Sequence, residues 1–364
     1  MLTIRMRLLG YFKRWFVVRR EARGYVWSEK TPYVFLLMLV TFRPTAGEAA
    51  GIRDVVIPAN ANQPRIVAEL WTPCSTPAPE MLIDRDGFPT TIRAVRNCVV
   101  TRKNLPLVLI SHGMFEDRFS HHDTAEALAD AGFAVVTLNH TEDSNQDIGG
   151  KSAADISSFL VRPIDIKRAL NFLLASPPAG IKVDQHRIGF FGFSRGGYTG
   201  LVLAGAQPDF DHITIPCPEN LLMCQQIREH KIPAHSSGYE PRITAYVIAD
   251  PVDFFPSKSS LRDVRAPLQL WSSEYGGMGV RPEDVSALEM NLPVKPEFHR
   301  AIGAGHLSFD CPCSEDQVKA NPPSVVCTDP KGFDRTAFHK RFDEEVVRFF
   351  REHLGPVHAI TKPQ

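Results

Sequence analysis

The sequence predicts an α/β protein in which a mostly parallel central sheet is flanked by helices. Apolar runs of strand length alternate with amphipathic segments from residue 52 to residue 355, and this alternation is typical of parallel sheets. The stretch GFSRGG (192–197) lies between an apolar run and a helix of small residues. Of the 364 residues, 43% are hydrophobic, which is enough to bury a sizeable core.

The order of the elements follows from where the apolar runs begin and end. We expect strands at 65–73, 105–113, 133–140, 187–193, 242–250, 266–273 and 297–305. We expect helices at 123–131, 162–176, 197–206 and 333–354. The second of these helices is predicted to carry one apolar face, made of Ile164, Ile166, Ala169, Leu170 and Leu173.

Two segments interrupt the alternation. Residues 75–99 are an early insertion, and residues 207–240 contain four prolines between a predicted helix and the next strand. Long irregular segments in a compact domain are often functional. We therefore expect residues 207–240 to form a cap or lid, with a surface decoration as the alternative.

The N-terminus differs from the rest of the chain. Residues 1–30 contain eight Lys and Arg against two Glu, and the apolar run YVFLLMLVTF (33–42) follows. A basic, then apolar, then small-residue order indicates a signal for export to the periplasm or the medium. The long basic lead suggests that the true start lies after Met1, and a basic tail with a buried segment is the alternative. The predicted organisation is an N-terminal segment, a main domain and a tail: 1–50, 52–355 and 356–364.

The charges are balanced, with 41 basic and 41 acidic residues. This balance argues against a nucleic-acid partner.

The seven cysteines form local groups that suit an oxidising compartment, with about three disulfides and one remaining thiol. Buried free thiols are the alternative, and we expect no metal site because one residue separates Cys311 from Cys313. The groups are Cys74 and Cys98, then Cys217 and Cys224, then Cys311, Cys313 and Cys327.

Ser194 is the candidate nucleophile. It is the central residue of Gly192-Phe193-Ser194-Arg195-Gly196, where an apolar strand meets a helix. A sharp strand-to-helix turn strains the serine backbone and exposes its Oγ, and small neighbours two residues away avoid a clash. The alternative is a serine that only completes a tight turn.

His306 is the candidate base because it follows a late apolar strand in the glycine-rich stretch AIGAGHLSF (301–309). A serine hydroxyl needs such a base. In α/β proteins whose nucleophilic serine lies at a strand-to-helix turn, the catalytic residues follow the order serine, acid, histidine along the chain. A loop histidine without a role is the alternative. The other histidines after Ser194 are His212, His230, His235, His299, His339, His353 and His358.

Two residues are candidates for the acid that orients the histidine. Asp250 ends the strand RITAYVIAD, and Glu274 ends the next strand. Most often the acid follows the penultimate strand of the sheet, which favours Glu274. Gly276, however, occupies the position after that strand where an aspartate is usual. We favour Asp250 and keep Glu274 as the alternative.

An oxyanion would need two backbone donors. The amide of Arg195 follows the nucleophile, and the amide of Met114 lies in the loop SHGMFEDR after an apolar strand. We expect His112 to shape this loop rather than to take part in the chemistry.

The motifs ISHG, GFSRGG and GAGH, in this order, resemble the α/β-hydrolase superfamily over residues 52–355. The resemblance is to bacterial predicted dienelactone hydrolases and to platelet-activating-factor acetylhydrolase-like esterases. In the latter, the acid lies in an Asp…Phe-Pro stretch similar to ADPVDFFP (249–256), which implies Asp250 as the acid. Dienelactone hydrolases have a cysteine where this chain has Ser194, so lactonase activity is not implied.

These features together predict a serine hydrolase that cleaves carboxylic esters, with short-chain or phospholipid-type acyl groups implied by the resemblance. The chemistry needs no metal or organic cofactor. The expected partner is a small-molecule or lipid ester, and membrane contact would come only through the N-terminal segment or a lipid substrate. The alternatives are an amidase or peptidase on the same fold and a binding protein without turnover.

Overall fold

A nine-stranded sheet forms the centre of the structure, in the order β11-β10-β9-β8-β6-β7-β2-β1-β5. β2 runs antiparallel to β1 and β7, and the strands from β7 through β6 to β11 are parallel. The prediction of a mostly parallel α/β sheet is therefore confirmed. This computed structural model describes residues 49–85, 89–100, 102–144, 154–178, 180–233, 238–319 and 324–355.

The elements lie close to the predicted positions. The strands of the sheet are β1 (Ala49–Ile57), β2 (Ile66–Cys74), β5 (Val95–Arg96), β6 (Leu105–Ser111), β7 (Ala134–Leu138), β8 (Val183–Phe193), β9 (Ile243–Ala249), β10 (Leu268–Ser273) and β11 (Glu297–Ala301). The α-helices are α1 (His122–Asp130), α2 (Ser157–Ala175), α3 (Arg195–Leu203), α4 (Leu222–Arg228), α5 (Lys258–Leu261), α6 (Pro282–Asn291), α7 (Glu315–Lys319) and α8 (Arg335–Leu354). The short 3-10 helices are η1 (Phe210–His212), η2 (His306–Phe309) and η3 (Val325–Cys327).

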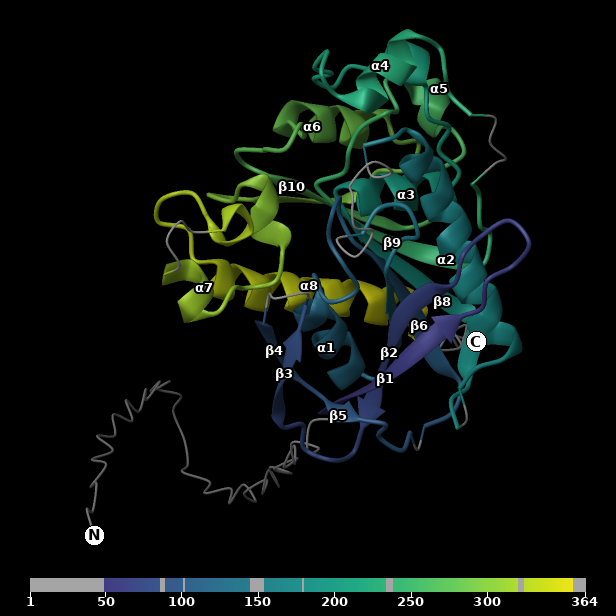
Figure 1. Ribbon diagram of the computed structural model, residues 1–364, viewed down its shortest axis with the longest axis vertical. Helices are drawn as coiled ribbons and strands as arrows, with labels where there is room; N and C mark the ends of the chain where they lie inside the picture. Colours follow the sequence, from purple (N-terminus) through teal and green to yellow (C-terminus); the bar gives the residue numbers. More distant parts are fainter. Residues whose placement is uncertain are drawn as a thin grey trace, which may run out of the picture. The chain divides into compact units, whose positions relative to one another are not determined.

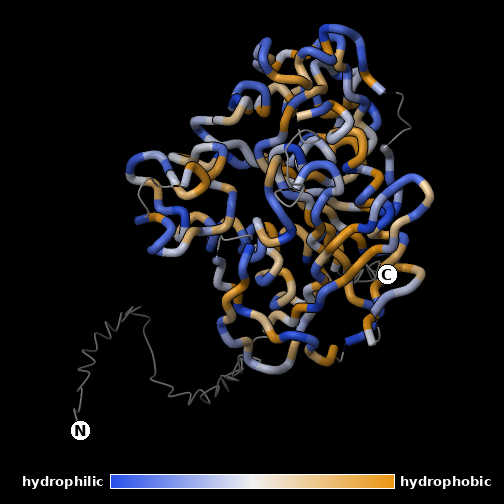
Figure 2. Tube along the Cα trace, in the orientation of Figure 1, coloured by the Kyte–Doolittle hydropathy of each residue, from blue (hydrophilic) through white to orange (hydrophobic). Residues whose placement is uncertain are grey.

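Helices cover both faces of the sheet, with α1 and α8 on one side and α2 and α3 on the other (Figure 1). Alternate residues of β6 enter the two resulting cores: Leu107 and Leu109 pack on the α2–α3 side, and Val108 and Ile110 on the α1–α8 side. Strands buried on both faces become continuous apolar runs, and Figure 2 shows this hydrophobic colour along the central strands.

The apolar face predicted for α2 is wrong at one position. Ile166, Ala169, Leu170 and Leu173 are buried, whereas Ile164 is 38% exposed. Two residues correspond to about 200° around an α-helix, so Ile164 and Ile166 cannot share a face.

The two insertions contain structure of their own. Residues 75–99 contain the separate antiparallel pair β3 (Glu80–Asp84) and β4 (Pro89–Arg93), followed by β5. Residues 207–240 contain η1 and α4. The first strand begins at Ala49, inside the N-terminal segment predicted for residues 1–50, and neither β1 nor α6 was predicted. The proposed signal segment and the tail from residue 356 lie outside the described residues.

Three disulfides join cysteines that are near one another in sequence: Cys74 to Cys98, Cys217 to Cys224, and Cys313 to Cys327. Cys311 is a buried free thiol. The number of pairs and the single remaining thiol agree with the expectation from the sequence.

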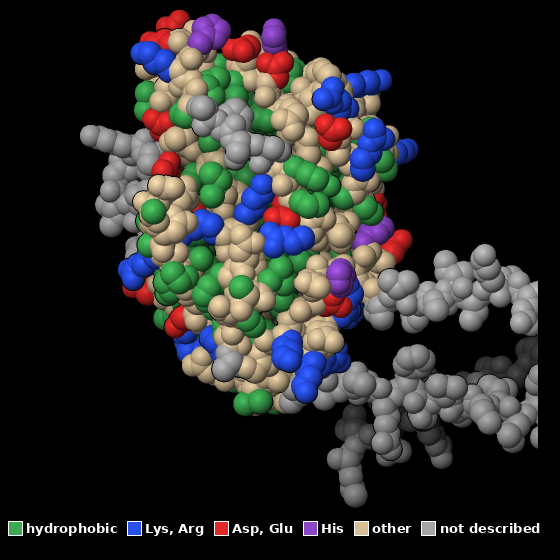
Figure 3. All heavy atoms as spheres, turned by 90° about the vertical axis from the view of Figure 1, so that its right-hand side faces the viewer, with side chains coloured by type: hydrophobic (Ala, Val, Ile, Leu, Met, Phe, Trp, Pro, Cys, Tyr) green, Lys and Arg blue, Asp and Glu red, His purple; other side chains and the backbone are tan. Residues whose placement is uncertain are grey.

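The surface drawn in Figure 3 has basic, acidic and apolar side chains interspersed. That face therefore carries no large area of a single charge sign. Among the described helices, none is long and apolar enough to cross a membrane.

Gly189 in β8 allows helix α8 to approach the sheet. A Cβ there would lie 2.6 Å from the Phe350 ring and 2.8 Å from a Leu354 methyl group. We predict that Gly189→Ala lowers the free energy of unfolding by about 1–3 kcal/mol, because the helix must move away from the strand. Urea denaturation measures this change. Gly305→Ala is the matched control, since its Cβ would meet nothing closer than 3.5 Å, and equal losses in both variants would contradict the prediction.

Candidate active site

Ser194 occupies a strained turn between β8 and α3. Its backbone has φ 54° and ψ −115°, a conformation that non-glycine residues rarely adopt. A Cβ on Gly192 would overlap the carbonyl of Gly196, and a Cβ on Gly196 would overlap the carbonyl of Ser111. The turn therefore requires glycine at both positions, as the sequence pattern predicts.

The structure brings Ser194, His306 and Asp250 into one hydrogen-bonded line. His306 Nε2 lies 3.0 Å from Ser194 Oγ, and His306 Nδ1 lies 2.7 Å from Asp250 Oδ2. Ser194 and His306 are nearly buried, and Asp250 is fully buried. In this geometry the histidine can accept the serine proton while the carboxylate stabilises the resulting positive charge.

Asp250 is fixed from the neighbouring strand. Its Oδ1 accepts a hydrogen bond from the Ser273 amide at 2.8 Å, and its Oδ2 accepts one from Ser273 Oγ at 2.7 Å. The alternative acid Glu274 points elsewhere, where its Oε2 accepts from the Gly303 amide at 2.6 Å. Glu274 thus supports the loop before His306 and does not contact the imidazole.

The loop after β10 holds His306 in place. The His306 amide donates to the carbonyl oxygen of Gly276 at 2.8 Å, and a Cβ on Gly277 would lie 3.2 Å from His306 Cβ. The Phe193 ring packs against the imidazole with ring centres 4.7 Å apart. Gly276, which stands where an acid is common, therefore positions the histidine through its backbone.

The residues that carry the two candidate oxyanion donors line the same cavity as Ser194. Arg195 is the first residue of α3, and Met114 lines the same cavity as Ser194 and His306. The first amides of a helix have no acceptor within the helix, which leaves them available to a developing negative charge. The Gly113 amide donates to Glu116 Oε2 at 2.8 Å, which fixes the loop containing Met114.

His112 belongs to the same loop, and its side chain is buried. Its Nε2 accepts from the His140 amide at 3.2 Å, and its Nδ1 lies 2.7 Å from the Gly113 carbonyl oxygen. This pattern places the single ring proton on Nδ1. Burial lowers the pKa of His112 well below its usual value, so the ring is neutral and joins two backbone segments.

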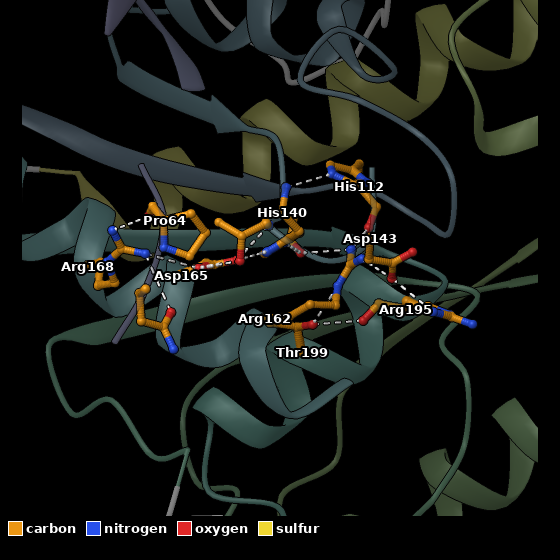
Figure 4. A network of polar contacts seen from close by, with 12 residues as sticks. Pro64, His112, His140, Asp143, Arg162, Asp165, Arg168, Arg195 and Thr199 are labelled. Carbon is orange, nitrogen blue, oxygen red and sulfur yellow. Dashed lines mark hydrogen bonds and ion pairs between the residues drawn. The ribbon is translucent and has the colours of Figure 1, made fainter. Parts of the chain in front are cut away.

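A buried network of charged side chains contacts the turn that contains Ser194 (Figure 4). Asp143 Oδ2 accepts from Arg162 Nη1 at 2.6 Å and from Arg195 Nη1 at 3.0 Å. Arg162 also donates to the carbonyl oxygen of His112 and, through Nε, to Thr199 Oγ1 at 3.3 Å. One arginine of α2 therefore binds both the loop after β6 and helix α3.

Sequence reasoning missed this network, since Asp143 follows β7 and Arg162 lies in a predicted helix without any local motif. Burial lowers the pKa of both Arg162 and Arg195, and the Asp143 carboxylate opposes this effect. Removing one member of a buried ion pair leaves an uncompensated charge, which is strongly destabilising.

A cavity of about 360 Å³ opens onto Ser194 and His306. Its wall is mostly apolar and includes part of the 207–240 segment, which was predicted to cap the site. The residues from that segment are Ile215, Pro216, Pro218, Leu221 and Met223. The cavity can therefore hold an apolar group next to the serine hydroxyl.

Comparison with known proteins identifies the fold. No family model matches the chain, and no curated protein sequence matches it. Among solved structures, a ferulic acid esterase from Streptomyces cinnamoneus is similar, with 19% sequence identity and a TM-score of 0.58. The match covers 88% of this chain and 95% of the esterase. The protein has the α/β-hydrolase fold.

Substitutions of the two candidate acids should change the rate at which Ser194 is labelled by different amounts. We expect a fluorophosphonate to label wild-type protein and not Ser194→Ala. Asp250→Asn should slow labelling by about 10³–10⁴-fold, because the imidazole loses the carboxylate that orients it. Glu274→Gln should stay within a few-fold of wild type, since glutamine can still accept from the Gly303 amide. Intact-mass spectrometry gives the rates, and slow labelling of Glu274→Gln with normal labelling of Asp250→Asn would reverse the assignment.

Proposed function

We propose that the protein is a serine hydrolase that cleaves carboxylic esters. The observation that carries this proposal is the line from Ser194 Oγ through His306 to Asp250, at 3.0 and 2.7 Å, at the mouth of an apolar cavity. The similarity to a ferulic acid esterase supports an ester as the substrate. The finer resemblance to predicted dienelactone hydrolases and acetylhydrolase-like esterases remains a prediction from the motifs.

In the proposed mechanism, Ser194 Oγ attacks the ester carbonyl as His306 Nε2 takes its proton. The amides of Met114 and Arg195 donate hydrogen bonds to the carbonyl oxygen, which becomes negatively charged. His306 then gives the proton to the departing alcohol, and an acyl-enzyme remains on Ser194. Water, deprotonated by His306, attacks this acyl group and releases the acid. Asp250 orients the imidazole throughout, through its hydrogen bond with His306 Nδ1.

The cavity wall favours an uncharged acyl group. Five of the lining residues come from the 207–240 segment and are apolar, and Phe159 and Val252 extend the apolar wall. Arg195 is turned away toward Asp143, so its charge is not offered to a substrate. We therefore propose short acyl chains, including those of phospholipid-type esters. Export through the N-terminal segment remains a prediction.

The first test is p-nitrophenyl ester hydrolysis over a series of acyl lengths. We expect wild-type turnover, and a fall of at least about 10⁴-fold in kcat/KM in Ser194→Ala, because the nucleophile is lost. Ser286→Ala on α6 is the matched control, since its hydroxyl donates to the Pro282 carbonyl of its own helix.

Each other outcome of this test has a defined meaning. Equal rates in wild type and Ser194→Ala would remove Ser194 from the mechanism. Fluorophosphonate labelling without ester turnover would favour an amidase or peptidase. Failure to label would favour a binding protein that has lost turnover.

A second test concerns the acyl cavity. Leu221 lines it, so Leu221→Trp should narrow it and reduce kcat/KM for long acyl chains by about 10-fold or more while acetyl esters react normally. Leu222→Trp is the matched control because the neighbouring Leu222 is exposed. A uniform change across all acyl lengths in Leu221→Trp would show that the acyl group binds elsewhere.

A further inference from the structure

Three potential metal ligands meet beside the candidate active site. Glu116 belongs to the loop SHGMFEDR (111–118) that contains Met114, here called the oxyanion loop, His121 immediately precedes α1, and Asp310 follows η2. One ligand atom from each lies within 4.8 Å of the other two. None of these three belongs to the line formed by Ser194, His306 and Asp250, although Glu116 also lines the cavity there.

The cluster contains buried polar atoms that lack hydrogen bonds. His121 is 1% exposed, and neither of its ring nitrogens has a hydrogen-bond partner among the described residues. Asp310 is also buried, and its Oδ1 has no hydrogen-bond partner within the part of the chain that the structure describes. A buried polar group without a partner is costly and needs an explanation. A cation bound among these side chains would satisfy one imidazole nitrogen and the carboxylate oxygen together.

We propose that Glu116, His121 and Asp310 bind a divalent cation of the zinc type. One imidazole and two carboxylates form a mixed ligand set that suits Zn²⁺. Calcium and magnesium prefer oxygen ligands alone, which makes the imidazole a poor partner for them. This proposal does not depend on the proposed ester hydrolysis, and it revises the expectation from the cysteine spacing that the chain has no metal site.

The geometry allows tetrahedral coordination with one open position. His121 Nε2 lies 3.4 Å from Glu116 Oε2, and two ligands of a tetrahedral zinc ion at about 2.1 Å are separated by roughly 3.4 Å. A second cavity, of about 360 Å³, is lined by Glu116, Asp310 and Ser120. It offers an entry path and room for a water molecule in the fourth position. Arg85 lines the same cavity and pairs with Asp117 at 2.9 Å.

The burial of the cluster also affects how its side chains ionise when no ion is bound. Burial lowers the pKa of His121 to about 4, so its ring is the neutral imidazole that metals bind. Burial raises the pKa of Glu116 to about 7 and that of Asp310 well above its usual value. A positive ion would offset the cost of keeping both carboxylates charged in this environment.

A cation here would connect two loops of the candidate active site. Glu116 lies two residues after Met114, and its Oε2 also accepts from the Gly113 amide. Asp310 lies four residues after His306, at the end of η2. The ion would therefore fix the oxyanion loop relative to the turn containing His306.

The test is metal binding by the full chain, produced without a polyhistidine tag and treated with a chelator. We expect isothermal titration with Zn²⁺ to give one site per chain in wild type, and ion addition to raise the melting temperature. Asp310→Asn and His121→Gln should weaken binding by about 10-fold or more each. Less than a tenth of an equivalent bound to wild type would overturn the proposal and leave a proton shared by the carboxylates in its place.

Two matched variants locate the site. Cys311→Ser changes a thiol that lines the second cavity, next to Asp310. Asp343→Asn changes a carboxylate in the separate cluster Asp123, His339 and Asp343. Both should bind Zn²⁺ as wild type does, and loss in either variant with retention in Asp310→Asn would overturn the assignment. If Asp310→Asn does not fold, Co²⁺ bound to wild type decides. A thiolate charge-transfer band would place the ion at a cysteine, whereas visible bands without it support nitrogen and oxygen ligands.

Discussion

The close approach of helix α3 to strand β6 is the constraint on which the candidate active site depends. A Cβ on Gly196 would overlap the carbonyl of Ser111, so only glycine lets the helix begin this near the strand. The Ser194 amide then reaches the carbonyl oxygen of Ala249 at 3.0 Å. Because Asp250 follows Ala249, the turn that strains the serine also places it beside the end of β9. The strain is thus balanced by hydrogen bonds from the sheet around it.

Buried charged side chains fix the orientation of loops that apolar packing alone leaves open. Apolar packing sets the distance between α2 and the sheet, yet it does not fix the rotation of a loop backbone. Arg162 does so with directed bonds to His112 and Thr199, while Asp143 forms an ion pair with both Arg162 and Arg195. The guanidinium of Arg195 also lies 4.4 Å from the centre of the Phe159 ring. Each bond joins a different segment, so the network relates the oxyanion loop to the serine turn.

The sequence predicts features that depend on neighbours along the chain and fails where they depend on distant ones. Ser194 and His306 stand out because glycines and apolar strands surround them locally. The acid could not be decided by spacing alone, since Asp250 and Glu274 both end strands, and only the loop geometry separates them. Asp143 carries no local signal because its partners lie 19 and 52 residues away. Ile164 was misplaced because an apolar residue next to a proline was counted without its angle around the helix.

The disulfides lie where the sheet gives least support. Cys74–Cys98 closes the first insertion, Cys217–Cys224 lies in the segment that lines the acyl cavity, and Cys313–Cys327 follows Asp310. A covalent link restricts the unfolded states of these segments. Ser194 and Asp250 are positioned by strand ends, and one part of the cavity wall is held by the Cys217–Cys224 link. Such a division permits the cavity wall to change in sequence while the line from Ser194 to Asp250 keeps its geometry.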